Sequence, residues 1–477
     1  MGWSLPNIPI KESAPAWSPW ICLLIIVAGV FVALIQVVMH SPIGGLAKLA
    51  SGYWLPLTAY TLMGIAIAIT LYLLWWEIQS YWVSNWNNWR RNSHLAWQYR
   101  AHQHLCVVRH ALLTADPQLL PRLVGGVTEP QDDVPPLTLA MDKPVIPGIS
   151  RFEQLCQHLI KQCRASFIQR YPSGQLTVLV QTTSMDKERE EEAFIRLWAA
   201  EGLPWTPTIK CLPDELLCHD WNQRLQATHA PVLVLALHYR QPEENLPEYA
   251  CALMLFPEAM LKPTERRDAV RVFRAMALNT GALPRELAEL RDMALQPAGI
   301  KHLVWYSGLS GSSAQALGRV INELSLPLHA DIAAAGIIDF AKISADYGRQ
   351  AGWLMVAAAT EMVNYGPGSH WLLHADNKQG YAMALGNSLP VSRDEEVKLS
   401  PLPYPAGALC LAILFNIAVF SAIAHFLPDW LFSSYGVLSM LLLLVVTLPG
   451  TVFLLRRTLA SLQRPRFIQA AGLARKE

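Results

Sequence analysis

The chain has 477 residues, enough for one large domain or two, and its charge is nearly balanced, with 38 Lys and Arg against 37 Asp and Glu. Balanced charge argues against nucleic-acid binding as the main function, because such domains concentrate basic residues on one surface. Hydrophobic residues make up 52% of the chain, and the mean hydropathy of +0.23 is high for a water-soluble domain. The eight cysteines are scattered, which excludes a dense secreted disulfide framework and predicts reduced thiols.

Four apolar stretches near the two ends predict transmembrane helices, arranged as two hairpins. The spans are residues 17–39 and 54–76 in the first hairpin (17–76), and residues 404–426 and 431–455 in the second hairpin (404–455). Residues 1–16 are polar and lack a cleavage motif, so we expect a retained N-terminus. Residues 456–477 form a basic tail.

The segment 77–150 begins with aromatic residues interleaved with arginines and ends in a Pro-rich connector. Its position directly after an apolar span favours a helix that continues from that span and lies along or leaves the membrane surface, over the alternative, stacking on single-stranded nucleic acid. The expected membrane-interface residues are Trp75, Trp76, Trp82, Trp86, Trp89, Arg90 and Arg91.

Arginines also predict the orientation of the chain. They follow the second and the fourth spans, whereas the short hairpin loops are nearly uncharged. By the positive-inside rule, we expect both termini and the central region on the cytoplasmic side of a bacterial inner membrane.

A group of possible metal ligands follows the aromatic segment: His102, His104, Cys106 and His110. On a helix, His102, Cys106 and His110 would share one face, but no second ligand group stands at zinc-finger spacing. A solvated or interfacial helix face is the favoured interpretation, so we expect no metal and no cofactor.

Between the hairpins, residues 151–398 predict an α/β domain. The expected elements of its second half are a strand at 302–307, a Gly/Ser turn at 308–313, a helix at 314–324, a strand at 328–331, a helix at 333–347, and strands at 369–375 and 381–386. The Ala-rich start of the 333–347 helix predicts close contact with its neighbours, as a central helix between two sheets.

This order resembles the thiolase-like fold of thiolases and β-ketoacyl synthases. In that family a strand ending in His-Gly-Thr-Gly-Thr leads into a helix, and a second His precedes a Gly-Ala-Ala-Gly helix. Here Ser307 stands at the position of the first His, and His329 lies one residue too far upstream of the sequence Ala-Ala-Ala-Gly at 333–336. The resemblance implies an α/β domain with α-β-α-β-α layers whose catalytic residues are lost. The apolar stretches place this domain between two transmembrane hairpins.

The family's nucleophile is a Cys at a helix N-terminus, where the helix dipole lowers its pKa. Cys211 and Cys218 are nearest in position, but neither has the family's small-residue context. With His329 they are the candidate catalytic residues, and packing or surface roles are favoured for all three. Gly308, Ser310, Gly311 and Ser312 form a turn whose backbone amides could bind an anion, although a tight strand-to-helix turn is the favoured interpretation.

Two functions follow from these features. The first is a non-catalytic inner-membrane scaffold or adaptor that presents a pseudo-thiolase domain to a cytoplasmic protein. Its layout is similar to membrane proteins associated with type VI secretion, which implies a secretion component or effector as the partner. The alternative is a membrane-bound, acyl-transferring condensing enzyme that uses Cys211 or Cys218 with His329. Transport is least favoured, because the spans lack charged residues.

The other expected partners are the lipid bilayer and a second copy of the chain, bound through the thiolase-like domain. No nucleic acid is expected.

Overall fold

The structure is a computed structural model that describes the chain apart from residues 1, 4, 40–50, 126–136, 140–147, 172, 183, 185, 212–217, 227–229, 241–244, 294, 298, 310, 333–335, 367, 377–378, 390–399 and 473–477. It consists of two compact units. The first comprises Met1–Leu5 and Leu95–Asp394, and the second comprises Pro6–His94 and Glu395–Glu477.

The first unit is an α/β domain built from two halves. The first half contains β1 (His104–Thr114), α3 (Leu119–Leu123), α4 (Arg151–Arg170), β2 (Gly174–Gln181), α5 (Lys187–Ala200), β3 (Trp205–Cys211), α6 (Cys218–Gln226), β4 (Val232–His238) and β5 (Tyr249–Phe256). The second half contains β6 (Val270–Phe273), β7 (Met276–Asn279), α8 (Leu283–Asp292), β8 (Leu303–Ser307), α9 (Gly311–Glu323), β9 (Ile337–Asp339), α10 (Phe340–Ile343), α11 (Ala351–Tyr365), β10 (Ser369–Asp376) and β11 (Gln379–Gly386). Between the halves lie a short 3-10 helix, Glu258–Met260, and α7 (Pro263–Asp268).

The two halves repeat one strand topology. Along the sheet the order is β3-β2-β4-β5-β1 in the first half and, in reverse, β6-β11-β10-β8-β9 in the second, with β7 paired to β11. In each half the three strands at the outer edge of the sheet are parallel. They are β3, β2 and β4 in the first half and β9, β8 and β10 in the second. The remaining two strands pair antiparallel. Pairing of β1 with β6 joins the halves into one continuous sheet.

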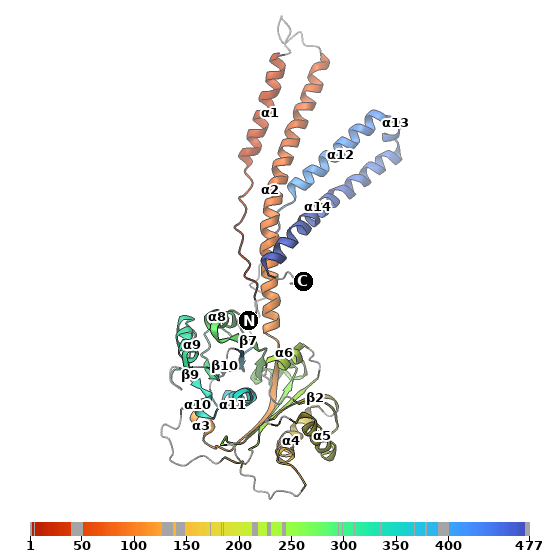
Figure 1. Cartoon of the computed structure of the whole chain (residues 1–477). Coiled ribbons are helices and arrows are strands. Elements are labelled where there is room, and N and C mark those ends of the chain that lie inside the picture. The colour runs from red at the N-terminus through yellow and green to blue at the C-terminus, as the bar shows by residue number, and fades with distance from the viewer. Residues whose placement is uncertain are drawn as a thin grey trace. The chain divides into compact units, whose positions relative to one another are not determined.

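Helices cover both faces of each half, which explains why several strands are apolar along their whole length. Every residue of β4 and β5 is buried. One core lies under α4 and α5, a second under α8 and α9, and a third surrounds α6 and α11 and includes strands of both halves. Figure 1 shows α11 inside the domain, with α4 and α5 on one side and α8 and α9 on the other. The predicted α-β-α-β-α layering is confirmed.

The central helix, however, is not where the sequence analysis placed it. It is α11, from Ala351 to Tyr365, and it contacts β1, β5, β10 and β11. The expected helix at 333–347 is wrong, because Gly336 has a φ of +71° and the next three residues form β9, parallel to β8. Residues 333–335 lie outside the described part of the chain. The expected strand at 328–331 is reduced to a single bridge between Leu328 and His302.

The start of the α/β unit also differs from the expectation. Residues 104–114, assigned to an interfacial helix and connector, form β1 in the middle of the sheet. His102, Cys106 and His110 therefore do not share a helix face. In the described residues, no three His, Cys, Asp or Glu side chains are grouped so that they could hold a metal ion.

The second unit contains α1 (Pro19–Met39), most of α2 (Ser51–Ala101), α12 (Ala406–Phe426), the short α13 (Pro428–Leu431) and α14 (Ser434–Ala470). α1, α2, α12 and α14 are long and apolar enough to cross a membrane. Both α2 and α14 continue well beyond the about 20 residues that a bilayer core requires.

The part of α2 that follows its apolar stretch continues as a helix, as predicted, and packs against the corresponding part of α14. Its position relative to a membrane stays a prediction. The Trp86 side chain is only 5% exposed and makes an edge contact with Phe467 of α14, at a centroid distance of 5.3 Å. Its indole N–H donates to the Pro9 carbonyl (3.0 Å), and Arg90 donates to the Ile8 carbonyl (2.8 Å). Trp86 is thus part of a small core between two helices and the N-terminal segment.

Candidate functional site

The candidate site lies at the carboxyl ends of β8 and β10, the region of a parallel sheet where α/β proteins place ligands. Ser307, the last residue of β8, is in register with His374 of β10. The turn after β8 requires glycine, because Gly308 has a φ of +72° and a Cβ there would lie 1.9 Å from the Ala375 carbonyl oxygen. The turn into α9 therefore passes directly against the end of β10.

His374 connects this strand end to the segment before α11. Its side chain is 1% exposed, and its Nε2 lies 2.7 Å from the Gly348 carbonyl oxygen. Burial lowers the pKa of His374, so the ring is neutral near pH 7 and donates its Nε2 proton to this carbonyl. Its Nδ1 has no hydrogen-bond partner among the described atoms.

An ion pair lies at the same corner of the domain, where β8 and β10 end and α11 begins. Arg349, two residues before α11, places its Nε 2.6 Å from Oδ2 of Asp376 at the end of β10. The two side chains are 46% and 30% exposed, so the pair is largely solvated. The residues Gly348-Arg349-Gln350 directly precede α11, the central helix of the second half.

Cys218, a candidate catalytic residue, is the first described residue of α6, and residues 212–217 before it lie outside the described part of the chain. The side chain of Cys218 lies outside what the structure describes. The first turns of α6 and α11 meet through Trp221 and Trp353, whose ring centroids are 5.7 Å apart at an interplanar angle of 87°. Both central helices therefore begin near one another.

The other two catalytic candidates lie elsewhere. Cys211 is the last residue of β3, the edge strand of the first half, and burial raises its pKa to about 12. A thiol with that pKa is almost entirely protonated at neutral pH and is a poor nucleophile. The His329 amide donates to the His302 carbonyl, just before β8 begins, whereas the turn follows β8. A five-residue strand spans roughly 16 Å, so His329 does not join Ser307 and Gly308.

Of the turn residues, Gly311 begins α9, Ser312 follows it, and Ser310 lies outside the described residues. Anion binding by this turn stays a prediction. Sequence reasoning missed Arg349 because it misplaced the central helix. The signal available in the sequence was a polar residue at the end of an apolar strand, such as His374, which indicates a possible site.

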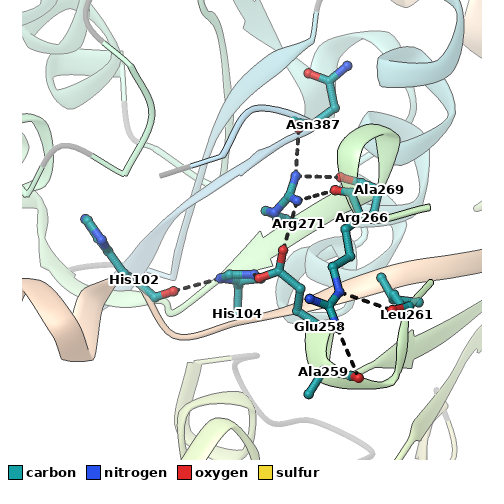
Figure 2. Close-up of polar contacts among 9 residues, drawn as sticks. All are labelled: His102, His104, Glu258, Ala259, Leu261, Arg266, Ala269, Arg271 and Asn387. Atoms are coloured by element: carbon teal, nitrogen blue, oxygen red, sulfur yellow. Dashed lines mark hydrogen bonds and ion pairs between the residues drawn. The ribbon is translucent and has the colours of Figure 1, made fainter. Parts of the chain in front are cut away.

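A second polar group lies where the two halves join, at the start of β1 and along β6 (Figure 2). Arg271 is 0% exposed and donates to the Ala269 carbonyl (3.1 Å), the Asn387 carbonyl (2.7 Å) and the Arg266 carbonyl. It also donates to Oε1 of Glu258, at 3.2 Å.

Glu258 links Arg271 to β1 through its other carboxylate oxygen. His104 Nε2 lies 3.1 Å from Glu258 Oε2, and His104 Nδ1 lies 2.8 Å from the His102 carbonyl. The hydrogen bond from His104 and that from Arg271 lower the pKa of Glu258 to about 2. The network connects β1, β6 and the segment after β11, so it holds the joint between the halves together.

Comparison with known proteins gives a fold but no family. No family model and no curated protein sequence matches the chain. Among solved structures, it is similar to a complex of a type II PKS acyl-carrier protein with its ketosynthase (10% identity, TM-score 0.42, covering 60% of this chain and 99% of that one). It is also similar to human mitochondrial 3-ketoacyl-CoA thiolase (10%, 0.35, 61% and 99%) and to Xanthomonas campestris OleA (9%, 0.36, 60% and 98%).

At these identities the likeness concerns the fold alone. The molecule combines an α/β domain of two halves that share one strand topology with four helices long and apolar enough to cross a membrane.

Proposed function

We propose that the chain is a membrane-anchored, non-catalytic scaffold or adaptor whose thiolase-like domain binds a protein partner. The observation that carries the proposal is the ion pair of Arg349 with Asp376 before the central helix. At the place where the resemblance implies the first catalytic histidine, this chain has Ser307, and the segment Gly348-Arg349 precedes the central helix.

These side chains are unsuited to acyl transfer. A guanidinium cannot accept a proton at any ordinary pH, and an unassisted serine hydroxyl is not a base. His374 is close to this corner, but it is 1% exposed and its Nε2 is occupied by the Gly348 carbonyl. A domain that keeps the layers of the fold with such a corner is better suited to present a surface than to activate a thioester.

The proposal includes an orientation and a class of partner. The arginines that follow the second and fourth apolar stretches favour both termini and the α/β domain on the cytoplasmic side of a bacterial inner membrane. The expected partner is a component or effector of a secretion machine such as type VI. A homodimer through the α/β domain is a further expectation.

One observation favours the alternative, a membrane-bound condensing enzyme. Cys218 is the first described residue of α6, and a thiol at a helix N-terminus would be stabilised as a thiolate by the backbone amides. The alternative needs an acyl thioester to transfer its acyl group to Cys218, with release of the carrier thiol.

The test combines affinity purification with acyl loading. The tagged full chain is purified from its native membrane, and the co-purified proteins are identified by mass spectrometry for the wild type, Cys218→Ala and the control Cys211→Ala. Intact-mass measurement after incubation with acylated acyl-carrier protein follows in parallel.

We expect all three proteins to recover the same secretion component or effector, and none to gain an acyl mass. Recovery of acyl-carrier protein alone, with an acyl adduct that Cys218→Ala abolishes and Cys211→Ala keeps, would overturn the scaffold proposal in favour of the enzyme.

A further inference from the structure

A groove lies between α2 and α14, beyond the apolar part of α14. The apolar run of α14 ends at Leu455, and the helix continues to Ala470. The groove has a volume of about 980 Å³, and its polar lining includes Trp89, Asn92, Arg457, Ser461, Arg464 and Gln469. All of these residues belong to the second unit.

The charge of the groove is positive. Arg457, Ser461 and Arg464 recur every three to four residues and share one face of α14. No Asp or Glu is among the described residues that line the groove. Two guanidinium groups that face one volume with no carboxylate in its lining favour an anionic ligand.

Other arginines in the same region are engaged outside the groove, and Arg457 itself also has an aromatic neighbour, since its guanidinium carbon lies 5.9 Å from the Phe453 ring centroid. Arg456 donates to the Pro403 carbonyl at 2.7 Å, and Arg466 lies 5.7 Å from the Trp82 ring centroid. Arg90 donates to the Ile8 carbonyl. The basic side chains of this region are therefore not interchangeable.

The walls of the groove are held in place by packing outside it. Phe467 contacts the rings of both Trp86 and Trp89, at centroid distances of 5.3 and 5.4 Å. The amide of Asn85 donates to the Gln463 side chain at 2.9 Å, and Gln463 donates to the Trp82 carbonyl at 2.7 Å. The spacing between α2 and α14 is thus set by contacts that need no ligand.

The position of the groove identifies the source of the anion. Arg457 lies two positions after Leu455, the end of the uninterrupted apolar run of α14, which places it where lipid phosphates lie if this run fills a bilayer core. Arg464 is seven residues further, about 10 Å along the helix. We propose that this groove binds the phosphate headgroup of an anionic phospholipid, held by Arg457 and Arg464, with its glycerol end against Trp89.

The test uses the full chain in a mild detergent, titrated with fluorescently labelled phosphatidylglycerol. Labelled phosphatidylcholine is the neutral probe, and inorganic phosphate is added as a competitor to distinguish a free anion from a lipid. The variant is Arg457→Gln/Arg464→Gln. Its matched control is Arg196→Gln/Arg319→Gln, which removes two arginines that are 65% and 75% exposed on the α/β unit.

A basic residue near an anionic lipid surface changes affinity about fivefold, so we expect the groove variant to bind phosphatidylglycerol roughly 25-fold more weakly. The control should bind as the wild type does, and phosphatidylcholine should bind at least tenfold more weakly than phosphatidylglycerol. Arg457→Lys/Arg464→Lys keeps the charge and should retain most of the affinity, which separates loss of charge from loss of folding.

Unchanged affinity of the glutamine variant would overturn the proposal. Equal binding of the two lipids would also overturn it, because charge would then play no part. Complete displacement of the lipid by inorganic phosphate at equal concentration would identify a site for free phosphate instead.

Discussion

Replacement of Glu258 by glutamine tests whether the polar network at the joint stabilises the α/β domain. The substitution keeps the size of the side chain and removes the only carboxylate that contacts Arg271 among the described residues. The Arg271 guanidinium is 0% exposed and would keep its bonds to the carbonyls of Ala269, Asn387 and Arg266.

The size of the expected destabilisation follows from the burial of Glu258 and Arg271. Breaking a fully buried ion pair costs about 3 to 5 kcal/mol, because the remaining charge is left uncompensated. Glu258 is 31% exposed, so water reaches its side of the pair, and Arg271 keeps three neutral acceptors. We therefore expect Glu258→Gln to destabilise the joint by about 2 kcal/mol, or roughly 30-fold in the opening equilibrium.

The pH dependence gives a second prediction from the same network. The pKa of Glu258 is about 2 in the folded chain, below the 4.5 of an unperturbed glutamate. The carboxylate therefore contributes its full stabilisation above about pH 4.5, and the contribution is lost as the pH falls toward 2. Because the Glu258 carboxylate is partly exposed, we expect the wild type to lose about 1 kcal/mol of this stabilisation over that pH range. The variant should lose none of it.

Hydrogen exchange measured by mass spectrometry on the full chain reports the opening of β1 and β6 directly. Glu323→Gln is a suitable control, since this side chain is 59% exposed at the end of α9, where it pairs with Arg319. The reasoning would be refuted if the amides of β1 and β6 exchanged as fast in the wild type as in Glu258→Gln. It would also be refuted if both proteins lost the same stability as the pH falls.

Three further substitutions test other parts of the structure. Gly308→Ala should lower the free energy of unfolding by about 2 kcal/mol, because Gly308 has a positive φ and the new methyl group would clash with a carbonyl oxygen of β10. Gly311→Ala is the control: its methyl group would have open space, so its thermal melt should match that of the wild type. Burial lowers the pKa of His302 to about 4, so its contribution to stability is complete above pH 6.5 and is lost as the pH falls toward 4. Denaturant unfolding at the two ends of that range should show this loss in the wild type and not in His302→Gln. Phe467→Ala should cost about 3 kcal/mol and speed hydrogen exchange in α2, while Phe453→Ala, 61% exposed, should leave that exchange unchanged.

The sequence revealed those elements whose burial leaves a simple pattern. The membrane hairpins were predicted because a bilayer requires long uncharged runs. β4 and β5 also have a simple pattern, because strands covered on both faces are apolar throughout. The central helix α11 was missed for the opposite reason. A helix buried all around has no polar face and therefore no helical periodicity to detect.

The site was less predictable than the fold. Cys218 could be placed on a helix from the order of elements, and it lies in α6. Arg349 and Asp376 lie 27 residues apart in the chain and meet only through the position of α11 beside β10. The partners of Arg271 depend in the same way on the pairing of β1 with β6, which no local pattern indicates.

The strand topology also has a consequence during synthesis. β1 leaves the ribosome first, yet Cys106 pairs with Phe256, which is 150 residues later in the chain, and β6 follows later still. At ordinary translation rates, both edges of β1 stay unpaired for on the order of ten seconds. An unpaired apolar strand is a template for aggregation, so the nascent chain should need a chaperone until β5 and β6 have emerged.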